Sequence, residues 1–201
     1  MSATKQNRSN PPARILKAAR KLFYEHGVDK VSTDMLAAEA CTSKMTIYKY
    51  FKDKDAIFCA FLDAELERLY NPKINLPDSA KGFDDALIDF GTNLLAFLSD
   101  PNVVRFDQMI ISQVTIQPEL TKLYYDRSYG ASYQALEQLI AHGQQQGFTK
   151  RTETPDLLAS MLLSAWQGKP YLLGLYGVQP VTFPSSKNYV EQILNVILGS
   201  C

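Results

Sequence analysis

A short stretch of the chain carries side chains with the chemistry needed to contact nucleic acid: Met45, Thr46, Tyr48 and Lys49. Lysine neutralises phosphate, threonine and tyrosine hydroxyls bond phosphates or base edges, and methyl-bearing side chains contact the thymine methyl. At about 100° per residue, these four side chains point largely to one side of a helix, and Ile47 and Phe51 point to the other. Many surface helices carry lysine and tyrosine, so this pattern gains its meaning from the segment before it.

Two short helices must position these side chains. Residues 42–51 are predicted to form the second helix and residues 32–40 the first, with Ser32 as the N-cap and Met35, Leu36 and Ala40 facing inward. Only Cys41 and Thr42 separate the two. Two short helices joined by so tight a turn predict a helix-turn-helix, whose second helix enters the DNA major groove.

The predicted DNA contacts come from both helices and from the turn after them. Lys52 and Lys54 begin the next helix, where they can bind phosphate. The polar arm of residues 1–10 carries Lys5 and Arg8, which can reach a minor groove, although an inert tail explains the arm equally well. The complete predicted set is Ser32, Thr33, Ser43, Lys44, Met45, Thr46, Tyr48, Lys49, Lys52 and Lys54.

The charge distribution supports a nucleic-acid-facing end. The net charge of the chain is zero, yet residues 1–54 hold 11 Lys and Arg against 5 Asp and Glu, a balance of +6 that leaves −6 for the rest. Such asymmetry indicates one end that faces nucleic acid. Random placement of charges on a solvated surface is the alternative.

Composition argues against several other classes of protein. No run is apolar enough to span a bilayer and the N-terminus is polar, so we expect a cytoplasmic protein without a membrane partner. The 3 cysteines form no C-x-x-C pair, and the 2 histidines lie in predicted surface positions. There is no phosphate-binding loop and no G-x-S-x-G motif. We therefore expect no enzyme activity, no cofactor and no metal.

Helix signals fill the remainder of the chain, so the predicted fold class is all-α. The first helix begins at Asn10-Pro11-Pro12 and ends at Gly27, and another begins at the Asp53 cap and reaches Asn71-Pro72. Residues 72–82 are a predicted linker. Apolar spacing then predicts helices over 83–100, 102–116, 117–147 and 154–174, with a kink or an end near Lys169 caused by Pro170, and a last helix from residue 185 or 186. The 102–116 helix is apolar nearly all round, which predicts burial on every side.

Residues 14–62 resemble the N-terminal domain of the TetR family, the tetracycline-repressor-like bacterial regulators. The resemblance rests on Arg-Ile-Leu-Lys-Ala-Ala-Arg-Lys-Leu-Phe at 14–23, Gly27, Ser32-Thr33, Tyr-Lys-Tyr-Phe at 48–51 and Lys-Asp-Ala-Ile at 54–57. In residues 100–177, an apolar helix that begins at a proline is followed by Gln117-Pro118-Glu119-Leu120, and this pattern is similar to that of AefR-like C-terminal domains. The division implied is an arm over 1–10, a helix-turn-helix domain over 11–54 and a helical regulatory and dimerisation domain over 55–201.

The chain departs from the family pattern at two places. The family usually has Gly-Val in the interhelical turn, where this chain has Cys41-Thr42, and a glycine where this chain has Met45. A non-glycine residue at a positive-φ turn position costs on the order of 1 kcal/mol. Met45 indicates a base preference of its own. A small residue filling a turn explains Cys41 better than a redox switch does.

The resemblance implies a homodimer whose last two helices form the interface and whose preceding helices enclose a ligand cavity. Leu158, Met161, Leu162 and Ala165 make one apolar stripe, and Val190, Ile193, Leu194 and Ile197 make the other; a single internal core is the alternative. The cavity would bind a small hydrophobic or aromatic effector. Its predicted lining is Phe90, Asn93, Phe97, Met109, Gln113, Tyr124, Tyr133 and Trp166, although aromatic residues at helical spacing also form ordinary cores.

The sequence thus predicts a ligand-responsive transcriptional repressor that binds a palindromic operator in double-stranded DNA as a dimer. A helical protein–protein interaction module that has lost DNA binding is the alternative. The cationic and hydroxyl groups around Tyr48 and Lys49 count against this alternative.

Overall fold

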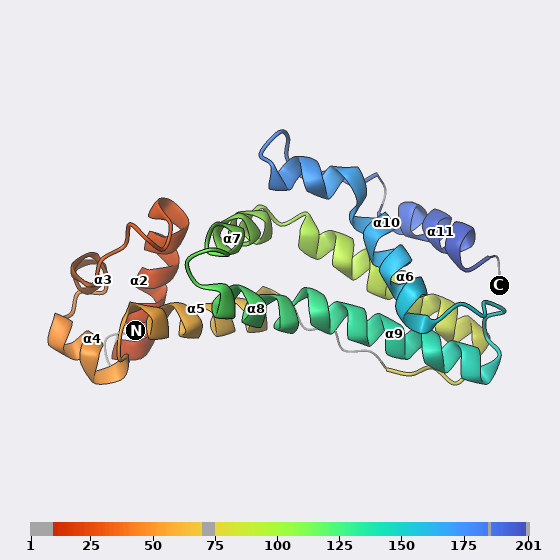
Figure 1. Cartoon of the computed structure of the whole chain (residues 1–201), viewed down its shortest axis with the longest axis horizontal. Coiled ribbons are helices and arrows are strands. Elements are labelled where there is room, and N and C mark those ends of the chain that lie inside the picture. The colour runs from red at the N-terminus through yellow and green to blue at the C-terminus, as the bar shows by residue number, and fades with distance from the viewer. Residues whose placement is uncertain (1–9, 70–74, 185, 200–201) are drawn as a thin grey trace, which may run out of the picture.

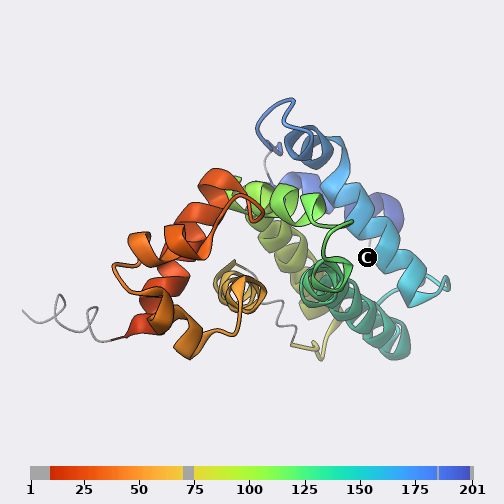
Figure 2. The same ribbon diagram turned by 60° about the vertical axis from the view of Figure 1, so that its left-hand side comes forward.

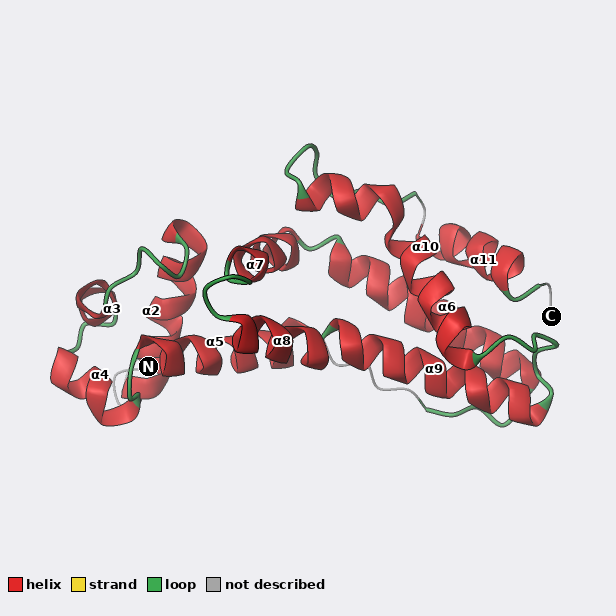
Figure 3. Ribbon diagram, viewed as in Figure 1, coloured by secondary structure: helices red, strands yellow, loops and turns green. Residues whose placement is uncertain are grey.

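A computed structural model of the protein describes residues 10–69, 75–184 and 186–199, and every regular element in those ranges is an α-helix (Figure 3). The prediction of an all-α fold is confirmed. The predicted arm over residues 1–9 and part of the predicted linker lie outside the described residues.

The N-terminal helices are α2 (Pro11–His26), α3 (Thr33–Glu39), α4 (Lys44–Tyr50) and α5 (Lys54–Leu69). Local signals set their ends. The Asn10 side chain accepts a hydrogen bond from the Ala13 amide at 3.3 Å, and Gly27 ends α2 with a φ of 79°, which glycine adopts without steric cost. These are the ends that the sequence predicts for the first helix.

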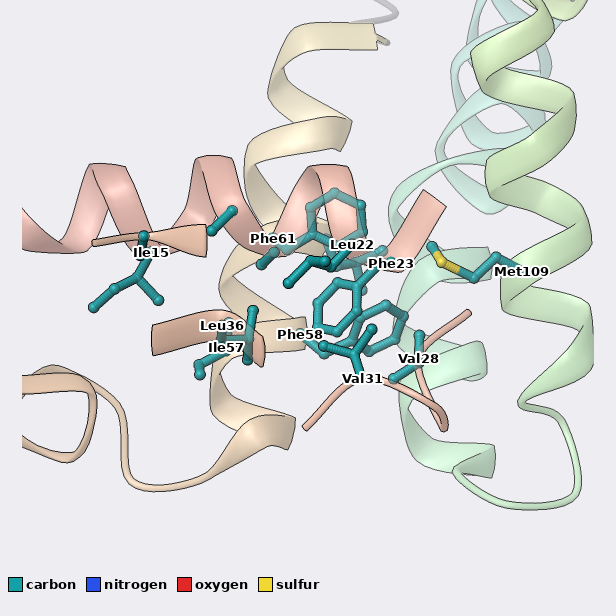
Figure 4. Packing of buried hydrophobic residues seen from close by; sticks show 14 of the residues in the cluster. Ile15, Leu22, Phe23, Val28, Val31, Leu36, Ile57, Phe58, Phe61 and Met109 are labelled. Atoms are coloured by element: carbon teal, nitrogen blue, oxygen red, sulfur yellow. The ribbon is translucent and has the colours of Figure 1, made fainter. Parts of the chain in front are cut away.

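The core of these helices extends into α5 and beyond. Ile15 and Phe23 of α2, Leu36 of α3 and Phe58 and Phe61 of α5 are almost fully buried against one another (Figure 4). Phe106, Met109 and Ile110 of α7 join the same cluster. The N-terminal unit therefore packs directly on the helical body, and α5 contributes to both.

The body consists of α6 (Ala80–Leu98), α7 (Pro101–Ser112), α8 (Pro118–Arg127), α9 (Tyr129–Gln146), α10 (Pro155–Leu175) and α11 (Ser186–Ile197). Figure 1 shows α7 and α8 beside the N-terminal helices, whereas α11 lies at the far end. A second core joins α6, α9, α10 and α11 around Trp166, whose side chain is 0% exposed. Figure 2 shows the N-terminal helices on one side of the molecule and the body on the other.

The predicted single helix over 117–147 is wrong, because the chain breaks between α8 and α9. Ser128 has a φ of −112° and a ψ of −87°, outside the helical region. Its hydroxyl donates to the carbonyl of Tyr124 at 2.6 Å, and Ser132 donates to the carbonyl of Ser128 at 2.9 Å. Serine hydroxyls that bond to the carbonyl four residues earlier bend helices. The apolar spacing continues across the break, so periodicity alone did not reveal it.

The expectation that the 102–116 helix is buried on all sides is also wrong. Helix α7 ends at Ser112, and the chain beyond it turns toward α8. Val103, Phe106 and Ile110 are buried, but the side chains of Ile111, Val114 and Ile116 are 53%, 55% and 57% exposed. Sequence marks a residue as apolar, whereas burial also requires a neighbouring element to cover it.

Helix α10 bends close to the predicted position. The backbone leaves the helical region at Gly168, with a φ of 48° and a ψ of −159°, two residues before Pro170. Proline removes an amide donor and clashes with the preceding turn, and glycine accommodates the required dihedral angles. The second half of α10, residues 169–175, turns away from the first half (Figure 1).

The two apolar stripes that the sequence assigns to a dimer interface contain both buried and exposed side chains. Leu158 and Leu162 of α10 and Val190, Leu194 and Ile197 of α11 lie in the second core of this one chain. Met161 is 45% exposed, and its neighbour Leu157 is 48% exposed. Most members of both stripes therefore pack within the chain, as the alternative of a single internal core predicts, and the dimer interface stays a prediction.

Candidate DNA-binding surface

Helix α4 presents two unlike faces, as the sequence predicts. Ile47 is 0% exposed and packs into the first core, and Phe51 is partly buried beside it. Met45 and Tyr48, on the other face, are 82% and 54% exposed. A helix seven residues long gains little stability from hydrogen bonding alone, so the burial of Ile47 is what holds α4 in place.

The two serines of the predicted set cap the two helices. Ser32 accepts a hydrogen bond from the Met35 amide at 3.2 Å and Ser43 one from the Thr46 amide at 3.1 Å. The Ser43 and Thr46 hydroxyls are also 2.9 Å apart. Both serines are exposed, so each can cap its helix and still face a ligand. Thr33 is partly buried in the first turn of α3.

The turn between α3 and α4 is held by a residue outside the predicted set. Cys41 has a φ of 49°, which lies in the left-handed region that glycine favours. The family pattern usually has glycine at this turn. Arg14 of α2 donates from Nε to the Ala40 carbonyl at 3.0 Å, and its guanidinium also bonds the Cys41 carbonyl. A cation at the C-terminal end of a helix neutralises carbonyls that have no partner within the helix. Arg14 thus ties the end of α3 and the turn after it to α2, a contact that no local sequence signal revealed.

The lysines of the predicted set differ in what they contact. Lys44 pairs with Asp34 of α3 at 2.8 Å, and this hydrogen bond raises the pKa of Lys44. Lys49 lies 5.7 Å from the ring centroid of Tyr50, and Lys52 is exposed. Lys54 instead donates to the carbonyl of Val28 at 3.0 Å and is partly buried. The structure therefore places Lys54 against the loop before α3 because it occupies the first turn of α5, which packs there.

Three polar contacts tie the N-terminal unit to α7 and α8. Gln113 donates to Asp29 at 3.2 Å, and Gln117 donates to Asp55 at 3.0 Å. Arg127 at the end of α8 forms an ion pair with Asp63 of α5. These contacts join α5 and the loop after α2 to the ends of α7 and α8, so a displacement of α7 or α8 strains them.

The aromatic cluster continues this connection through the core. Phe106 of α7 meets Phe61 of α5 edge-on with ring centroids 5.4 Å apart, and it meets Tyr124 of α8 at 5.2 Å. Tyr24 of α2 packs 6.2 Å from Phe106 and donates to the buried Glu65 of α5 at 3.1 Å. Interiors are close-packed, so such a cluster transmits small shifts between helices.

The eight predicted ligand-contact residues do not converge. Met109 and Tyr124 lie in the first core, and Phe90, Phe97, Tyr133 and Trp166 lie in or against the second. Asn93 is exposed, and Gln113 is buried at the contact with the N-terminal unit. Trp166 and Phe90 pack with ring centroids 6.2 Å apart, and the Trp166 indole nitrogen has no hydrogen-bond partner among the described residues.

The junction between the two cores holds a buried carboxylate that sequence reasoning missed. Asp107 of α7 is 3% exposed. Tyr124 donates to its Oδ1 at 2.5 Å, Tyr129 of α9 donates to its Oδ2 at 2.9 Å, and Tyr171 in the second half of α10 also bonds Oδ2. The Tyr129 and Tyr171 hydroxyls are 2.5 Å apart. The signal available in the sequence was one acidic residue on the Val103, Phe106 and Ile110 face of an otherwise apolar helix.

Burial changes the acid–base behaviour of this Asp107–tyrosine cluster. It raises the pKa of Asp107, against the opposing effect of hydrogen bonds from Tyr124, Tyr171 and Tyr129. Burial and the charge of Asp107 raise the pKa of each tyrosine as well, so all three stay protonated donors at neutral pH.

One cleft lies beside α7, and another lies beside the turn between α3 and α4. One of about 450 Å³ lies between α7 and the loop after α10, lined by Ser99, Pro101, Val104, Arg105, Gln108, Gly174, Gly177, Val178, Gln179, Pro180 and Val181. Another of about 640 Å³ lies beside Arg14, Lys17, Lys21 and Cys41. The described residues include no group of three potential metal ligands, and none of their helices is long and apolar enough to cross a membrane.

Comparison with known proteins places the two units in one family. Residues 15–61 match the model of the bacterial regulatory proteins of the TetR family, and residues 85–200 match that of the AefR-like transcriptional repressor C-terminal domain. The uncharacterised HTH-type transcriptional regulator YdeS of Bacillus subtilis is 30% identical over 66% of this chain, an alignment that spans just 64% of YdeS. The HTH-type transcriptional repressor SCO4008 of Streptomyces coelicolor is 26% identical over 76% of this chain and 75% of its own length.

Solved structures agree with the sequence matches. The flavonoid-responsive regulator FrrA is 26% identical, with a TM-score of 0.77 over 95% of this chain and 98% of its own. MexZ of Pseudomonas aeruginosa, at 19% identity and a TM-score of 0.73 over 94% of this chain and 96% of its own, has the same fold. The family-model matches cover more than half of the sequence, and the chain belongs to the TetR family of bacterial transcriptional regulators, with an AefR-like C-terminal domain.

Proposed function

We propose that this protein is a cytoplasmic, homodimeric transcriptional repressor that leaves a palindromic operator when a small aromatic or hydrophobic effector binds, and that it has no catalytic role. The observation that carries the proposal is the division of α4, with Ile47 0% exposed and Met45 82% exposed on opposite sides. Met45 presents an apolar side chain to solvent beside Tyr48 and Lys49, and the major groove offers thymine methyls and phosphates to such a surface.

A dimer is supported by exposed apolar side chains at the far end from α4. Leu157 and Met161 of α10 are one helical turn apart and 48% and 45% exposed, and Val196 of α11 is 79% exposed. A two-fold interface buries the same patch from each copy. Two copies of α4 then reach half-sites one DNA turn apart, about 34 Å centre to centre.

The effector is proposed to act through α7 and α8. Phe106, Gln113 and Arg127 connect these helices to α2, α5 and the loop before α3. An effector that favours another position of α7 shifts the population toward dimers whose two α4 helices have the wrong separation. Such dimers can occupy one half-site but not both.

The aromatic character of the proposed effector is supported by the interior of the body. Phe90 and Trp166 pack in the second core with their ring planes tilted by 36°, and Met109 lies in the first core with Tyr124, a member of the Asp107–tyrosine cluster. The unpaired indole nitrogen of Trp166 offers a donor. FrrA, which has the same architecture, is a flavonoid-responsive regulator. Of the eight predicted contacts, Phe90, Phe97, Met109, Tyr124, Tyr133 and Trp166 remain in the proposal, and Asn93 and Gln113 leave it.

Selection from random duplexes tests the proposal. The purified full-length protein is incubated with a pool of random duplex DNA at moderate salt, and the retained DNA is sequenced. We expect an enriched palindrome whose half-sites lie about one helical turn apart. Tyr48→Ala and Lys49→Ala should abolish enrichment. Tyr125→Ala, which removes a tyrosine that is 52% exposed on α8 and far along the chain from α4, is the matched control.

The negative result is equally clear. A folded, dimeric protein that enriches no sequence at any salt concentration is not a sequence-reading repressor, and the helical body would then be the functional part as an interaction module. Enrichment of a single half-site would contradict the dimeric arrangement alone.

A further inference from the structure

The Asp107–tyrosine cluster has the chemistry of a ligand-binding site. We propose that Asp107 anchors the effector, that the effector class is neutral aromatic molecules bearing a phenolic hydroxyl, and that this hydroxyl replaces that of Tyr171 on the carboxylate. The inference rests on the proposed function, since it names the ligand class and the contact through which that regulation begins.

The carboxylate is held by hydroxyl donors alone. Tyr124 donates to one oxygen at 2.5 Å, and Tyr129 and Tyr171 donate to the other. The ion pairs of the described residues do not include Asp107, which is 3% exposed. A buried carboxylate is stable only while its lone pairs are occupied, so a donor that leaves must be replaced by another of similar strength. A phenol from outside meets that requirement.

The cleft of about 450 Å³ lies between α7 and the end of α10, two of the four helices that build this cluster, and its lining includes none of the four cluster residues. Val104 in its wall precedes Asp107 by one turn of α7, and Gly174 follows Tyr171 by one turn of α10. Residues three apart are neighbours on a helix, so the Asp107–Tyr171 contact lies about one helical turn from the cleft wall. Its apolar wall includes Pro101, Val178 and Val181, which suit an aromatic ring.

Tyr171 is the donor that can leave. It lies on residues 169–175, which follow the break at Gly168; Leu172 in this segment is 54% exposed, and Tyr176 directly after it is 81% exposed. Besides the Tyr171 contact, Gln108 of α7 donates to two carbonyls of this segment, that of Gly174 at 3.3 Å and that of Leu175 at 2.9 Å. Tyr124 lies in α8 and Tyr129 begins α9, and Ser128 between them bonds the Tyr124 carbonyl at 2.6 Å, so the two tyrosines are held together and keep their places.

The surroundings select a neutral donor over a cation. Arg105 lies in the cleft wall, where its guanidinium repels a positively charged ligand. The three tyrosines also show that neutral hydroxyls satisfy this carboxylate. A phenol that replaces Tyr171 leaves the net charge of the site unchanged, whereas a cation would add charge to a buried site.

Calorimetry with a matched pair of probes tests the inference. 4-Butylphenol and 4-butylanisole have nearly the same shape, but the methyl ether cannot donate a hydrogen bond. We expect wild-type protein to bind the phenol at least about tenfold more tightly than the ether, because hydrogen bonds to charged groups are stronger than neutral ones. Tyr171→Phe removes the competing donor and should strengthen phenol binding about tenfold without changing ether binding. Tyr125→Phe, on an exposed tyrosine, is the control and should change neither.

Asp107→Asn should bring the two affinities together, and circular dichroism verifies that this variant folds. Equal binding of phenol and ether by wild-type protein, or binding of neither, overturns the inference, as does weaker phenol binding by Tyr171→Phe. Gel shifts on the selected operator are run beside the calorimetry. If the protein binds the operator but not the phenol, the proposed function stands and the inference about Asp107 fails. If it binds the phenol but not the operator, the proposed function is refuted and the Asp107 site stands.

Discussion

The two faces of α4 lead to opposite predictions for substitutions two residues apart. Ile47 is 0% exposed within the first core, and Met45 is 82% exposed. Truncating a buried isoleucine to alanine loses its transfer free energy and leaves a cavity, which together cost about 2–5 kcal/mol. Truncating an exposed methionine changes stability by less than about 0.5 kcal/mol.

These free energies translate into measurable shifts. For a chain of 201 residues, 1 kcal/mol corresponds to about 2–4 °C in Tm, so Ile47→Ala should lower Tm by about 4–20 °C. Urea unfolding followed by circular dichroism gives the free energy of unfolding directly, provided that the m-value stays constant. Ile47→Val is the graded control and should cost about 0.5–1.5 kcal/mol.

DNA binding should show the reverse pattern. Met45→Ala should fold as the wild type does and change which base pair is preferred at one position of each half-site, as measured by repeating the duplex selection. The reasoning is refuted if Ile47→Ala unfolds within about 0.5 kcal/mol of wild type, or if Met45→Ala loses more than about 1 kcal/mol of stability.

Three further predictions concern backbone conformation and buried charge. Cys41→Gly should stabilise the protein by up to about 1 kcal/mol in urea unfolding, because Cys41 has a φ of 49°, and Cys41→Ala should not stabilise it. Gly168→Ala should destabilise the folded protein by about 1–3 kcal/mol, because the φ of Gly168 is 48° and an added Cβ would lie 3.3 Å from the Tyr189 hydroxyl. An unchanged Tm would contradict the non-helical backbone conformation at Gly168. The pKa of Asp107 is raised in the folded state, so the folded protein binds this proton more tightly than the unfolded chain does. Wild-type protein should therefore gain stability relative to Asp107→Asn as the pH falls from about 8 toward about 4. If the difference between their free energies of unfolding does not change with pH, this prediction is contradicted.

Sequence alone determined the features that depend on neighbouring residues. Asn10, Ser32 and Ser43 cap their helices through side chains that reach amides three residues away, and Gly27 ends α2 through its own backbone freedom. The opposite faces of α4 follow from helical geometry and from the burial of Ile47. These interactions lie within one turn, so residue type and spacing contain all the information needed.

Tertiary structure decided what depends on distant residues. Arg14 reaches carbonyls 26 and 27 positions away, and Lys54 reaches a carbonyl 26 positions away. Periodicity identified α7 as apolar but could not show that Ile111 and Val114 would be left uncovered, nor that both α10 and α11 stripes would pack mostly inside one chain.

The Asp107–tyrosine cluster shows the limit most clearly. Its members are separated by 17, 22 and 64 positions from Asp107, and each tyrosine taken alone has the spacing of an ordinary core residue. A buried carboxylate becomes acceptable only when the fold brings enough donors to it, and that depends on the break at Ser128 and the bend at Gly168. The chain sequence supplied the groups, and the packing of four helices brought their atoms within hydrogen-bonding distance.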